Sequence, residues 1–403
     1  MVSPARRAAY EVVLRVFEDE AYADRAFGRA AEGLDPRDRA LAQQIAFGTV
    51  ERSRTLDHGI EALGRRPVRK LDPPVRAALR VGAYQLAFLD GVPPRAAVNE
   101  SVELVRAAGL ERAVAFTNAV MRRCAEGLRP LVEALPEGAL KHSYPDWIYE
   151  VWRRDWSEEE ALALMRAQNE APETVVRLVR GEIEGEPTDV PGAYRVERVY
   201  EHALAEGRIW PQSRGSILAG LTVASRAGER VLDLCAAPGG KATQLAGEVV
   251  AVEKHPGRAR ELEANCRLLG ADNVTVLNAD ALALPPELAG FDHALVDAPC
   301  SGLGVLNQRP DLRWRAKPLP ELQLALIEAA AARVRPGGTL VYSVCTVNAD
   351  ENEAVVDASG LEPADLGAEW PAFRHPKRPE LLLTLPHRHG TAGFFVARLK
   401  ITS

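Results

Sequence analysis

Two cysteines in this chain occupy similar positions, each where an apolar run ends. Cys300 stands in "VDAPCSGLG" and Cys345 in "LVYSVCTVN". A cysteine is a core residue as a thiol, and a nucleophile or a metal ligand as a thiolate. Both cysteines follow predicted strands of a parallel sheet, on the side where such sheets bind ligands. Their placement favours a pair of reactive thiols.

Metal binding and disulfide bonding are the competing uses of these thiols. The number of cysteines is odd and the chain contains no CxxC, which argues against structural zinc and a disulfide framework. The PCxxC of a deaminase zinc site is also absent, because position 303 is Leu303. We expect no metal. Cys124 and Cys266 are predicted core residues on apolar helix faces, and Cys235 is expected to offer only its backbone to a ligand.

Composition sets the broad class. With 403 residues, 47% hydrophobic and 26% charged, the chain is expected to form two or three globular domains. No apolar run is long enough for a membrane helix, and acidic residues interrupt the start where a signal peptide would be apolar. We therefore expect a cytoplasmic protein without membrane contact. A net charge of −6 does not identify a partner, and a monomer is the default expectation.

The elements that must position the thiols fall in three regions. Residues 1–128 show apolar spacing of three and four, which predicts an all-helical bundle. Residues 129–222 are expected to form a connector and a small α+β segment, and residues 223–403 alternate strands with helices, which predicts a parallel sheet. Helices are expected at 8–17, 39–60, 74–89, 95–109, 112–124, 146–157, 158–169, 239–247, 256–270 and 320–338. Strands are expected within 173–181, 230–235, 248–253, 273–278, 292–299 and 338–345.

Polar side chains follow the predicted strands of the last region. The carboxyl ends of parallel strands meet at one edge of a sheet, so these side chains are expected to lie near one another. The clustered residues are Asp233, Cys235, Glu253, Asp280, Asp297, Cys300 and Cys345.

The glycine-rich turn "LDLCAAPGGKATQ" (232–244) indicates which ligand this edge holds. It is not a P-loop, because Cys235 and Ala242 stand where that motif needs Gly and Ser or Thr, and it is not GxGxxG. Glu253 ends the second strand, where a ribose diol is usually bound, and Asp280 ends the third. Carboxylates beside an exposed backbone, without a phosphate signature, favour a cationic nucleoside. S-adenosylmethionine is therefore favoured over a nicotinamide cofactor.

A thiol pair beside a methyl donor suits one kind of chemistry. Carbon 5 of a pyrimidine is a poor nucleophile, but a thiolate added to carbon 6 makes it an enamine that accepts a methyl group. The carbon-5 proton must then leave and the thiol must be expelled. This requires an attacking thiol, a neighbouring group that resolves the adduct, and an acid near N3 or the amino group. Cys300, Cys345 and Asp297 supply these groups.

The motifs "DLCAAPGGK", "VDAPCSGLGVLNQRPDLRW", "GGTLVYSVCTVNADEN" and "HRHGTAGFFVARL" resemble the Sun/Fmu branch of the RNA (cytosine-5) methyltransferases. "GVPPRAAVNESVELVR" and "AFTNAVMRRC" are similar to the NusB-like domain of that branch. The resemblance implies a Rossmann-like α/β methyltransferase domain after an all-α RNA-binding domain and a small α+β segment. It implies that Cys345 attacks, that Cys300 assists release and that Asp297 faces the target base. The implied cofactor contacts are Cys235, Ala236, Ala237, Pro238, Gly239, Gly240, Lys241, Glu253, Asp280 and Asp297.

The sequence departs from the family where hydroxyl support of the nucleophile is concerned. Val344 and Thr346 flank Cys345, whereas the family usually has Thr-Cys-Ser. The implied reaction is methylation of carbon 5 of a cytosine in ribosomal RNA of the small subunit, 16S. Transfer RNA as substrate, a non-catalytic NusB-like RNA-binding protein and a nicotinamide dehydrogenase are the alternatives.

Two basic segments are candidates for RNA contact. "NQRPDLRWR" (307–315) carries Arg309, Arg313, Trp314 and Arg315, which fit backbone or stacking contacts with RNA and equally a solvated helix start. Arg65, Arg66, Arg69 and Lys70 in the helical region fit RNA binding or a polar loop.

Overall fold

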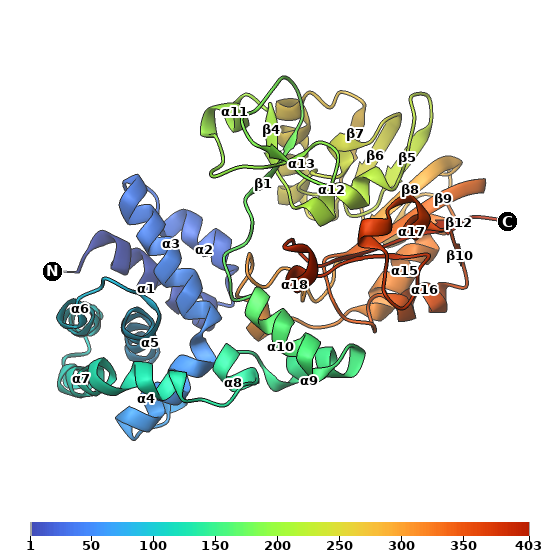
Figure 1. Cartoon of the computed structure of the whole chain (residues 1–403). Helices are drawn as coiled ribbons and strands as arrows, with labels where there is room; N and C mark the ends of the chain where they lie inside the picture. Colours follow the sequence, from blue (N-terminus) through green and yellow to red (C-terminus); the bar gives the residue numbers. More distant parts are fainter. Residues whose placement is uncertain (1, 403) are drawn as a thin grey trace. The chain divides into compact units, whose positions relative to one another are not determined.

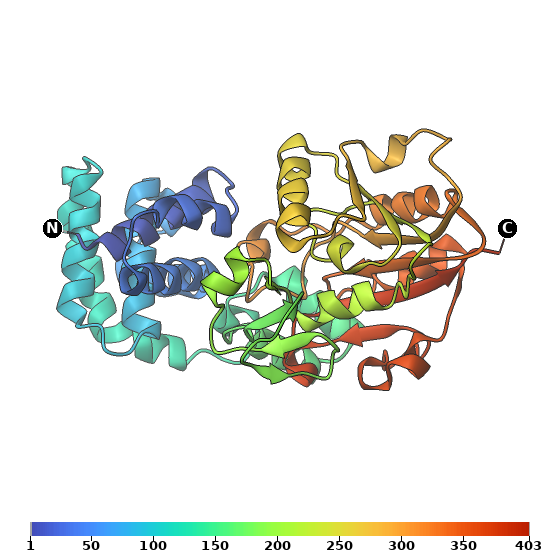
Figure 2. The same ribbon diagram turned by 90° about the horizontal axis from the view of Figure 1, so that it is seen from above.

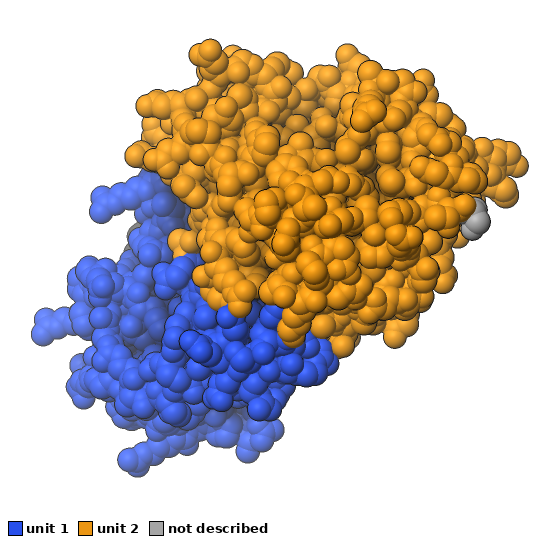
Figure 3. All heavy atoms as spheres, turned by 45° about the vertical axis from the view of Figure 1, so that its right-hand side comes forward, with its two compact units in different colours: residues 1–170, 306–315 blue, residues 171–305, 316–403 orange. Residues whose placement is uncertain are grey.

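The computed structural model describes residues 2–402 and divides the chain into two compact units, coloured separately in Figure 3. Unit 1 comprises Met1–Glu170 and Leu306–Arg315, and unit 2 comprises Ala171–Val305 and Ala316–Ser403. The expected middle region 129–222 is thus shared between the units. The domain boundaries at 128 and 222 stay a prediction.

Unit 1 is helical, as its apolar spacing predicts (Figure 1). In α1, Ala8, Val12 and Val16 recur every four residues and are buried, so one face of the helix packs in the bundle core. The helices are α1 (Pro4–Glu18), α2 (Ala23–Ala30), α3 (Pro36–Glu51), α4 (Ser53–Gly64), α5 (Pro73–Phe88), α6 (Pro94–Ala107), α7 (Glu111–Glu133), α8 (Ala139–His142), α9 (Asp146–Asp155), α10 (Glu158–Ala167) and α14 (Leu312–Arg315), with a 3-10 turn at Val68–Lys70.

Three expectations for unit 1 were wrong. The single helix expected at 39–60 is broken at Arg52, because the side chain of Ser143 accepts from the amides of Arg54 and Thr55 at 3.1 and 3.4 Å and caps a new helix. Helix α2 was not expected at all. Helix α7 runs past its expected end through Pro130, which lies on an exposed side.

Unit 2 contains an eight-stranded sheet in the order β10-β12-β9-β8-β5-β6-β7, with β11 beside β12. The pairs from β9 to β7 are parallel and those of β12 are antiparallel. The predicted parallel sheet is confirmed. The strands are β5 (Arg230–Asp233), β6 (Glu248–Val252), β7 (Val274–Leu277), β8 (Phe291–Asp297), β9 (Val334–Val344), β10 (Glu362–Pro363), β11 (Leu382–Thr384) and β12 (Phe394–Lys400).

Helices pack on this sheet, as Figures 1 and 2 show. The packing is made by apolar side chains. Ile217 and Leu218 of α12 form one core with Val231, Leu295 and other inward residues of the strands. Leu262 and Cys266 of α13 pack against Ala251. The helices are α11 (Glu201–Ala205), α12 (Arg214–Leu221), α13 (Pro256–Leu269), α15 (Pro320–Ala331), α16 (Glu353–Ser359), α17 (Leu366–Glu369) and α18 (Pro386–His389), with 3-10 turns at Ala281–Ala283 and Pro371–Phe373.

The helix expected at 239–247 was wrong. Only a 3-10 turn, Ala242–Gln244, forms there. Gly239 and Gly247 have φ angles of +108° and +84°, and these left-handed conformations bound the segment and leave room for a single turn. A second, antiparallel sheet in the order β2-β3-β1-β4 joins β1 (Val175–Leu178), β2 (Glu186–Pro187), β3 (Ala193–Arg195) and β4 (Ile209–Pro211).

Candidate active site

The sheet order brings the carboxyl ends of β5, β8 and β9 side by side. The chain runs from β5 outward to β7 and returns to β8 on the other side of β5, which makes a topological switch point of the kind that binds ligands. Asp233 ends β5 and Asp297 ends β8, while Cys345 directly follows β9. Ser343 of β9 pairs with Asp297 of β8.

The two thiols lie together. The Sγ atoms of Cys300 and Cys345 are 3.5 Å apart, and both residues are half-buried. The hydrogen bond to Cys345 raises the pKa of Cys300 well above its ordinary value, and burial and the charges of Cys345 and Glu351 add to this effect. A pair at this distance shares one ionisation, because the first thiolate opposes the second.

Backbone and hydroxyl contacts hold the thiol pair in place. The amide of Gly304 donates to the carbonyl of Cys345 at 3.0 Å, which fastens the Cys300 turn to the end of β9. The hydroxyls of Ser301 and Thr346 lie 2.8 Å apart, so the residues that follow the two cysteines are also bonded. The hydroxyl at the unusual Thr346 is therefore used within the site.

Asp297 lies between the glycine-rich turn and β9. One carboxylate oxygen accepts from Nζ of Lys241 at 2.7 Å, and the other accepts from the hydroxyl of Ser343 at 2.8 Å. The Lys241 ammonium is almost buried and lies 5.0 Å from the centre of the Phe394 ring. The pair fixes the end of the turn to the end of β8 and leaves Asp297 partly exposed.

Asp233 is a completely buried carboxyl with an unsatisfied atom. Its Oδ1 accepts from the amide of Cys235 at 3.3 Å, whereas Oδ2 has no hydrogen-bond partner within residues 2–402. Burial, and after it the charge of Asp297, raises the pKa of Asp233 to about 7. A buried orphan oxygen at this place fits a donor group of a bound ligand.

The glycine-rich turn packs closely against neighbouring side chains. A Cβ at Gly239 would lie 2.7 Å from Cδ1 of Leu262, and a Cβ at Gly240 would lie 3.1 Å from Nε1 of Trp210, so a side chain at either position would press on these neighbours. Burial raises the pKa of Cys235, and the carboxylates of Asp233, Asp297 and Glu253 raise it further. The Cys235 thiol is therefore disfavoured as a nucleophile, and its predicted backbone contact with a ligand stays a prediction.

The other two predicted acids follow the next strands. Glu253 is nearly buried, accepts from the amide of His255 at 2.8 Å and lies 3.5 Å from Arg258. Asp280 is more exposed, and the hydrogen bond from Lys254, together with the Leu282 amide, lowers its pKa. Carboxylate oxygens are acceptors, which suits the hydroxyl groups and exocyclic amine of a nucleoside.

The site residues therefore fit a cationic nucleoside. The orphan oxygen of Asp233 and the acid of Glu253 offer acceptors. The basic side chains beside the site, Lys241, Lys254 and Arg258, are each paired with an acid. Among residues 2–402 there is no group of three or more His, Cys, Asp or Glu side chains placed to hold a metal ion. Within that same range, none of the helices is both long and apolar enough to cross a membrane.

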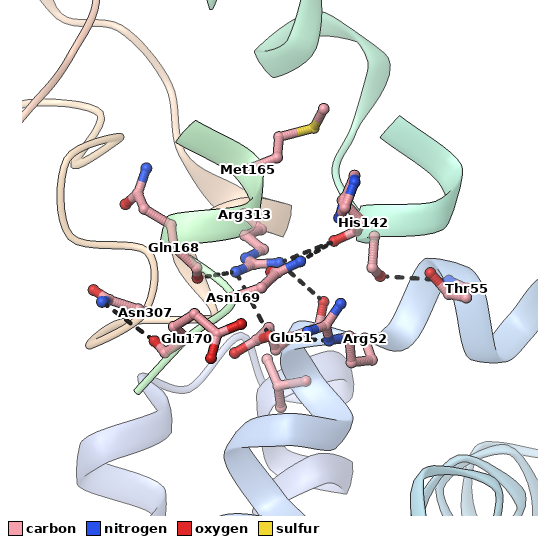
Figure 4. Close-up of polar contacts among 12 residues, drawn as sticks. Glu51, Arg52, Thr55, His142, Met165, Gln168, Asn169, Glu170, Asn307 and Arg313 are labelled. Atoms are coloured by element: carbon pink, nitrogen blue, oxygen red, sulfur yellow. Dashed lines mark hydrogen bonds and ion pairs between the residues drawn. The ribbon is translucent and has the colours of Figure 1, made fainter. Parts of the chain in front are cut away.

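The segment 307–315 departs from both sequence interpretations at Arg313. It belongs to unit 1, where Arg313 has no exposed surface and donates to the carbonyl of Gln168 at 2.7 Å, with His142 and Glu51 carbonyls within 3.5 Å (Figure 4). Its guanidinium lies 4.0 Å from the centre of the Tyr144 ring. Arg313 is thus an internal anchor, neither solvated nor available to RNA.

The neighbours of Arg313 are also engaged within unit 1. Nε1 of Trp314 donates to the carbonyl of Val50 at 2.7 Å, and Arg315 donates to the carbonyl of Glu20 at 2.6 Å. Arg309 and Arg315 both lie over the Tyr22 ring, at 5.1 and 4.1 Å from its centre. No local sequence pattern indicates this anchoring, because its partners are carbonyl groups and rings far away in the chain.

Predicted core cysteines are confirmed, and some site features were missed. Cys124 and Cys266 are buried in α7 and α13. The sequence placed Asp233 at the sheet edge but gave it no function, although an acid directly before a glycine-rich turn was a usable signal. It also missed Glu351, which lies in the polar run "NADENE" and resembles a solvated helix start.

Comparison with known proteins agrees with this geometry. The model of the 16S rRNA methyltransferase RsmB/F family matches residues 220–400, and that of the NusB family matches residues 3–126. The crystal structure of PH0851 has the same fold, with a TM-score of 0.83 at 24% identity over 99% of both chains. The fold and the site define a methyltransferase with a Rossmann-like domain and a NusB-like helical domain.

Proteins that are similar to this chain over almost its whole length identify its family. The chain is 32% identical to the probable ribosomal RNA small subunit methyltransferase B of Synechocystis sp., over 98% of this chain and 99% of that protein. It is 36% identical to ribosomal RNA small subunit methyltransferase B of Thermus thermophilus, over 90% of this chain and 89% of that protein. The chain belongs to the RsmB/F family of 16S rRNA methyltransferases.

Proposed function

We propose that this protein methylates carbon 5 of a cytosine in ribosomal RNA of the small subunit, through a covalent bond between Cys345 and carbon 6. The observation that carries the proposal is the 3.5 Å separation of the Cys300 and Cys345 sulfurs beside Asp297 at the switch point of the sheet. A single thiol would support attack alone, whereas two adjacent thiols support both attack and release.

S-adenosylmethionine is the proposed donor and supplies an electrophilic methyl group. The glycine turn (Cys235–Lys241), Glu253 and Asp280 bind it, and Asp233 Oδ2 accepts from one of its donor groups. Lys241 positions the Asp297 carboxyl group, which faces the base near N3 and its amino group. There Asp297 stabilises the proton that balances the negative charge of the enamine formed when Cys345 adds to carbon 6. The target cytosine must leave its stack to reach this depth.

The thiol steps balance as follows. The Cys345 thiolate forms the C6–S bond, and the electrons of the C5–C6 double bond form the new bond from carbon 5 to the methyl group as the S–CH3 bond of the donor breaks and leaves a neutral thioether. Cys300 then releases its own proton to solvent, its thiolate takes the carbon-5 proton, the electrons of that C–H bond restore the double bond, and the C6–S bond breaks. Cys345 leaves as a thiolate and Cys300 ends as a thiol, so charge is conserved.

The helical unit is proposed to bind RNA. Arg65, Arg66, Arg69 and Lys70 are all exposed around one 3-10 turn. Such a cluster suits phosphate contacts, which position RNA without reading its sequence.

The test uses purified protein, S-adenosylmethionine and RNA from cells that lack this protein. Wild type should form 5-methylcytosine in small-subunit ribosomal RNA, Cys300→Ala should accumulate a denaturant-resistant adduct with RNA, and Cys345→Ala should give neither product nor adduct. Equal activity of the three proteins would overturn the assigned roles, and methylation of transfer RNA alone would overturn the substrate.

A further inference from the structure

A buried carboxylate lies behind the thiol pair, and the reaction steps above do not use it. Glu351 has no exposed surface. It accepts hydrogen bonds from the amide and the hydroxyl of Ser301, the former at 2.9 Å, and from the Leu319 amide at 3.1 Å. Nε2 of Gln323 and Nδ2 of Asn348 donate to it at 2.9 and 3.2 Å.

These bonds join the two segments that carry the cysteines. Ser301 directly follows Cys300, and Asn348 lies in the loop after Cys345. The carbonyl of Glu351 also accepts from the Tyr342 hydroxyl of β9 at 2.6 Å. One residue therefore fixes the Cys300 turn, the Cys345 loop and the strand between them.

The carboxyl group of Glu351 is buried without a basic partner among the described residues. Burying an ionised carboxylate costs several kcal/mol, and within residues 2–402 no Lys, Arg or His bonds to this one. The polar donors around it compensate that cost, because hydrogen bonds to an ionised acceptor are stronger than neutral ones. The donors leave a negative charge close to Cys300, and this charge acts on the pKa of Cys300 in addition to the larger effects of Cys345 and burial.

We propose that Glu351 is the positioning residue of the thiol pair: it holds the two cysteine segments in register and places its buried carboxyl group next to the Cys300 turn while Cys345 attacks. The proposal rests on the function proposed above. Once Cys345 is bonded to the base, its sulfur carries no charge, and Cys300 becomes the sulfur of the pair that ionises. Glu351 thereby helps to order the two steps, attack before release.

The test measures the thiols directly, without RNA or methyl donor. Alkylation of Cys300 by iodoacetamide is followed against pH by peptide mass spectrometry in the full chain. Glu351→Gln should move the pH midpoint of Cys300 alkylation to lower pH. At a pH below the wild-type midpoint, alkylation should then be at least about threefold faster, because each unit of pKa shift changes the thiolate fraction tenfold. Glu351→Asp, which keeps the charge, should restore the midpoint. The matched control is Glu353→Gln, whose carboxylate pairs with His375 at 2.7 Å, and it should match wild type.

Positioning has its own readout, the rate at which diamide oxidises Cys300 and Cys345 to a disulfide. Ser301→Ala, which keeps the Glu351 carboxyl group, should slow this reaction, and thermal unfolding identifies any variant that fails to fold. If Glu351→Gln does not fold, Ser301→Ala and Glu351→Asp decide the matter. Folded variants with wild-type midpoint and oxidation rate would overturn the proposal. Neither thiol assay involves methyl transfer. A protein that fails the methylation test can therefore still show the predicted changes in alkylation and oxidation, so the two failures are distinguishable.

Discussion

The distance between the two sulfurs predicts that removing one of them changes the ionisation of the other. Two thiolates 3.5 Å apart repel by about 5 kcal/mol at an effective dielectric constant of about 20. Since about 1.4 kcal/mol is a factor of ten, the doubly charged pair is disfavoured more than about a thousandfold. The pair therefore carries at most one negative charge near neutral pH.

Cys345→Ser replaces the ionisable partner of Cys300 with a hydroxyl of similar size. The largest cause of the raised pKa of Cys300 is thereby removed, so its pKa should fall and its alkylation midpoint should move to lower pH. Peptide mass spectrometry after iodoacetamide treatment measures this midpoint for Cys300 alone. Cys266→Ser, in the buried face of α13, is the control and should leave it unchanged. An alkylation midpoint that stays in place or rises in Cys345→Ser would show that Cys345 does not raise the pKa of Cys300.

Two further predictions concern stability. The pKa of Asp233 is raised from 3.8 to about 7, so the buried carboxyl stabilises the fold in its protonated form and this stability is lost as pH rises through about 7. Denaturant unfolding without ligand measures the free energy of unfolding at pH 5 and at pH 8. Between these two pH values wild type should lose about 3 kcal/mol more of it than Asp233→Asn does. Equal losses would show that burial does not raise the pKa of Asp233. Arg313→Met leaves buried carbonyls without their donor and should lower the free energy of unfolding by about 3 kcal/mol. The exposed control Lys317→Met should change it by less than about 0.5 kcal/mol, and equal values for the two variants would show that the anchor contributes nothing.

The sequence predicted the features that local pattern controls. The five parallel strands were found because β-branched runs such as Val249–Val252 are buried on both faces of a covered sheet. The edge that gathers Asp233, Asp297 and Cys345 followed from strand direction alone. The close approach of Cys300 and Cys345 could be expected for the same reason, since β8 and β9 are neighbours.

Long-range partners explain what the sequence missed. The break at Arg52 depends on Ser143, which supplies a cap from elsewhere in the chain. Arg313 appears polar in a basic run but is buried by carbonyl groups of unit 1. In the sequence Glu351 is one acid among several, and only the fold surrounds it with donors. In each case the deciding interaction joins residues that no local periodicity relates.

Mass spectrometry of the protein–RNA adduct locates the proposed covalent bond between Cys345 and the cytosine. The adduct that forms between Cys300→Ala and its RNA is digested with protease and nuclease, and mass spectrometry identifies the modified peptide. We expect one methylated cytidine fragment attached to the peptide that contains Cys345. Attachment at any other residue, or methylated RNA released without an adduct, would contradict it.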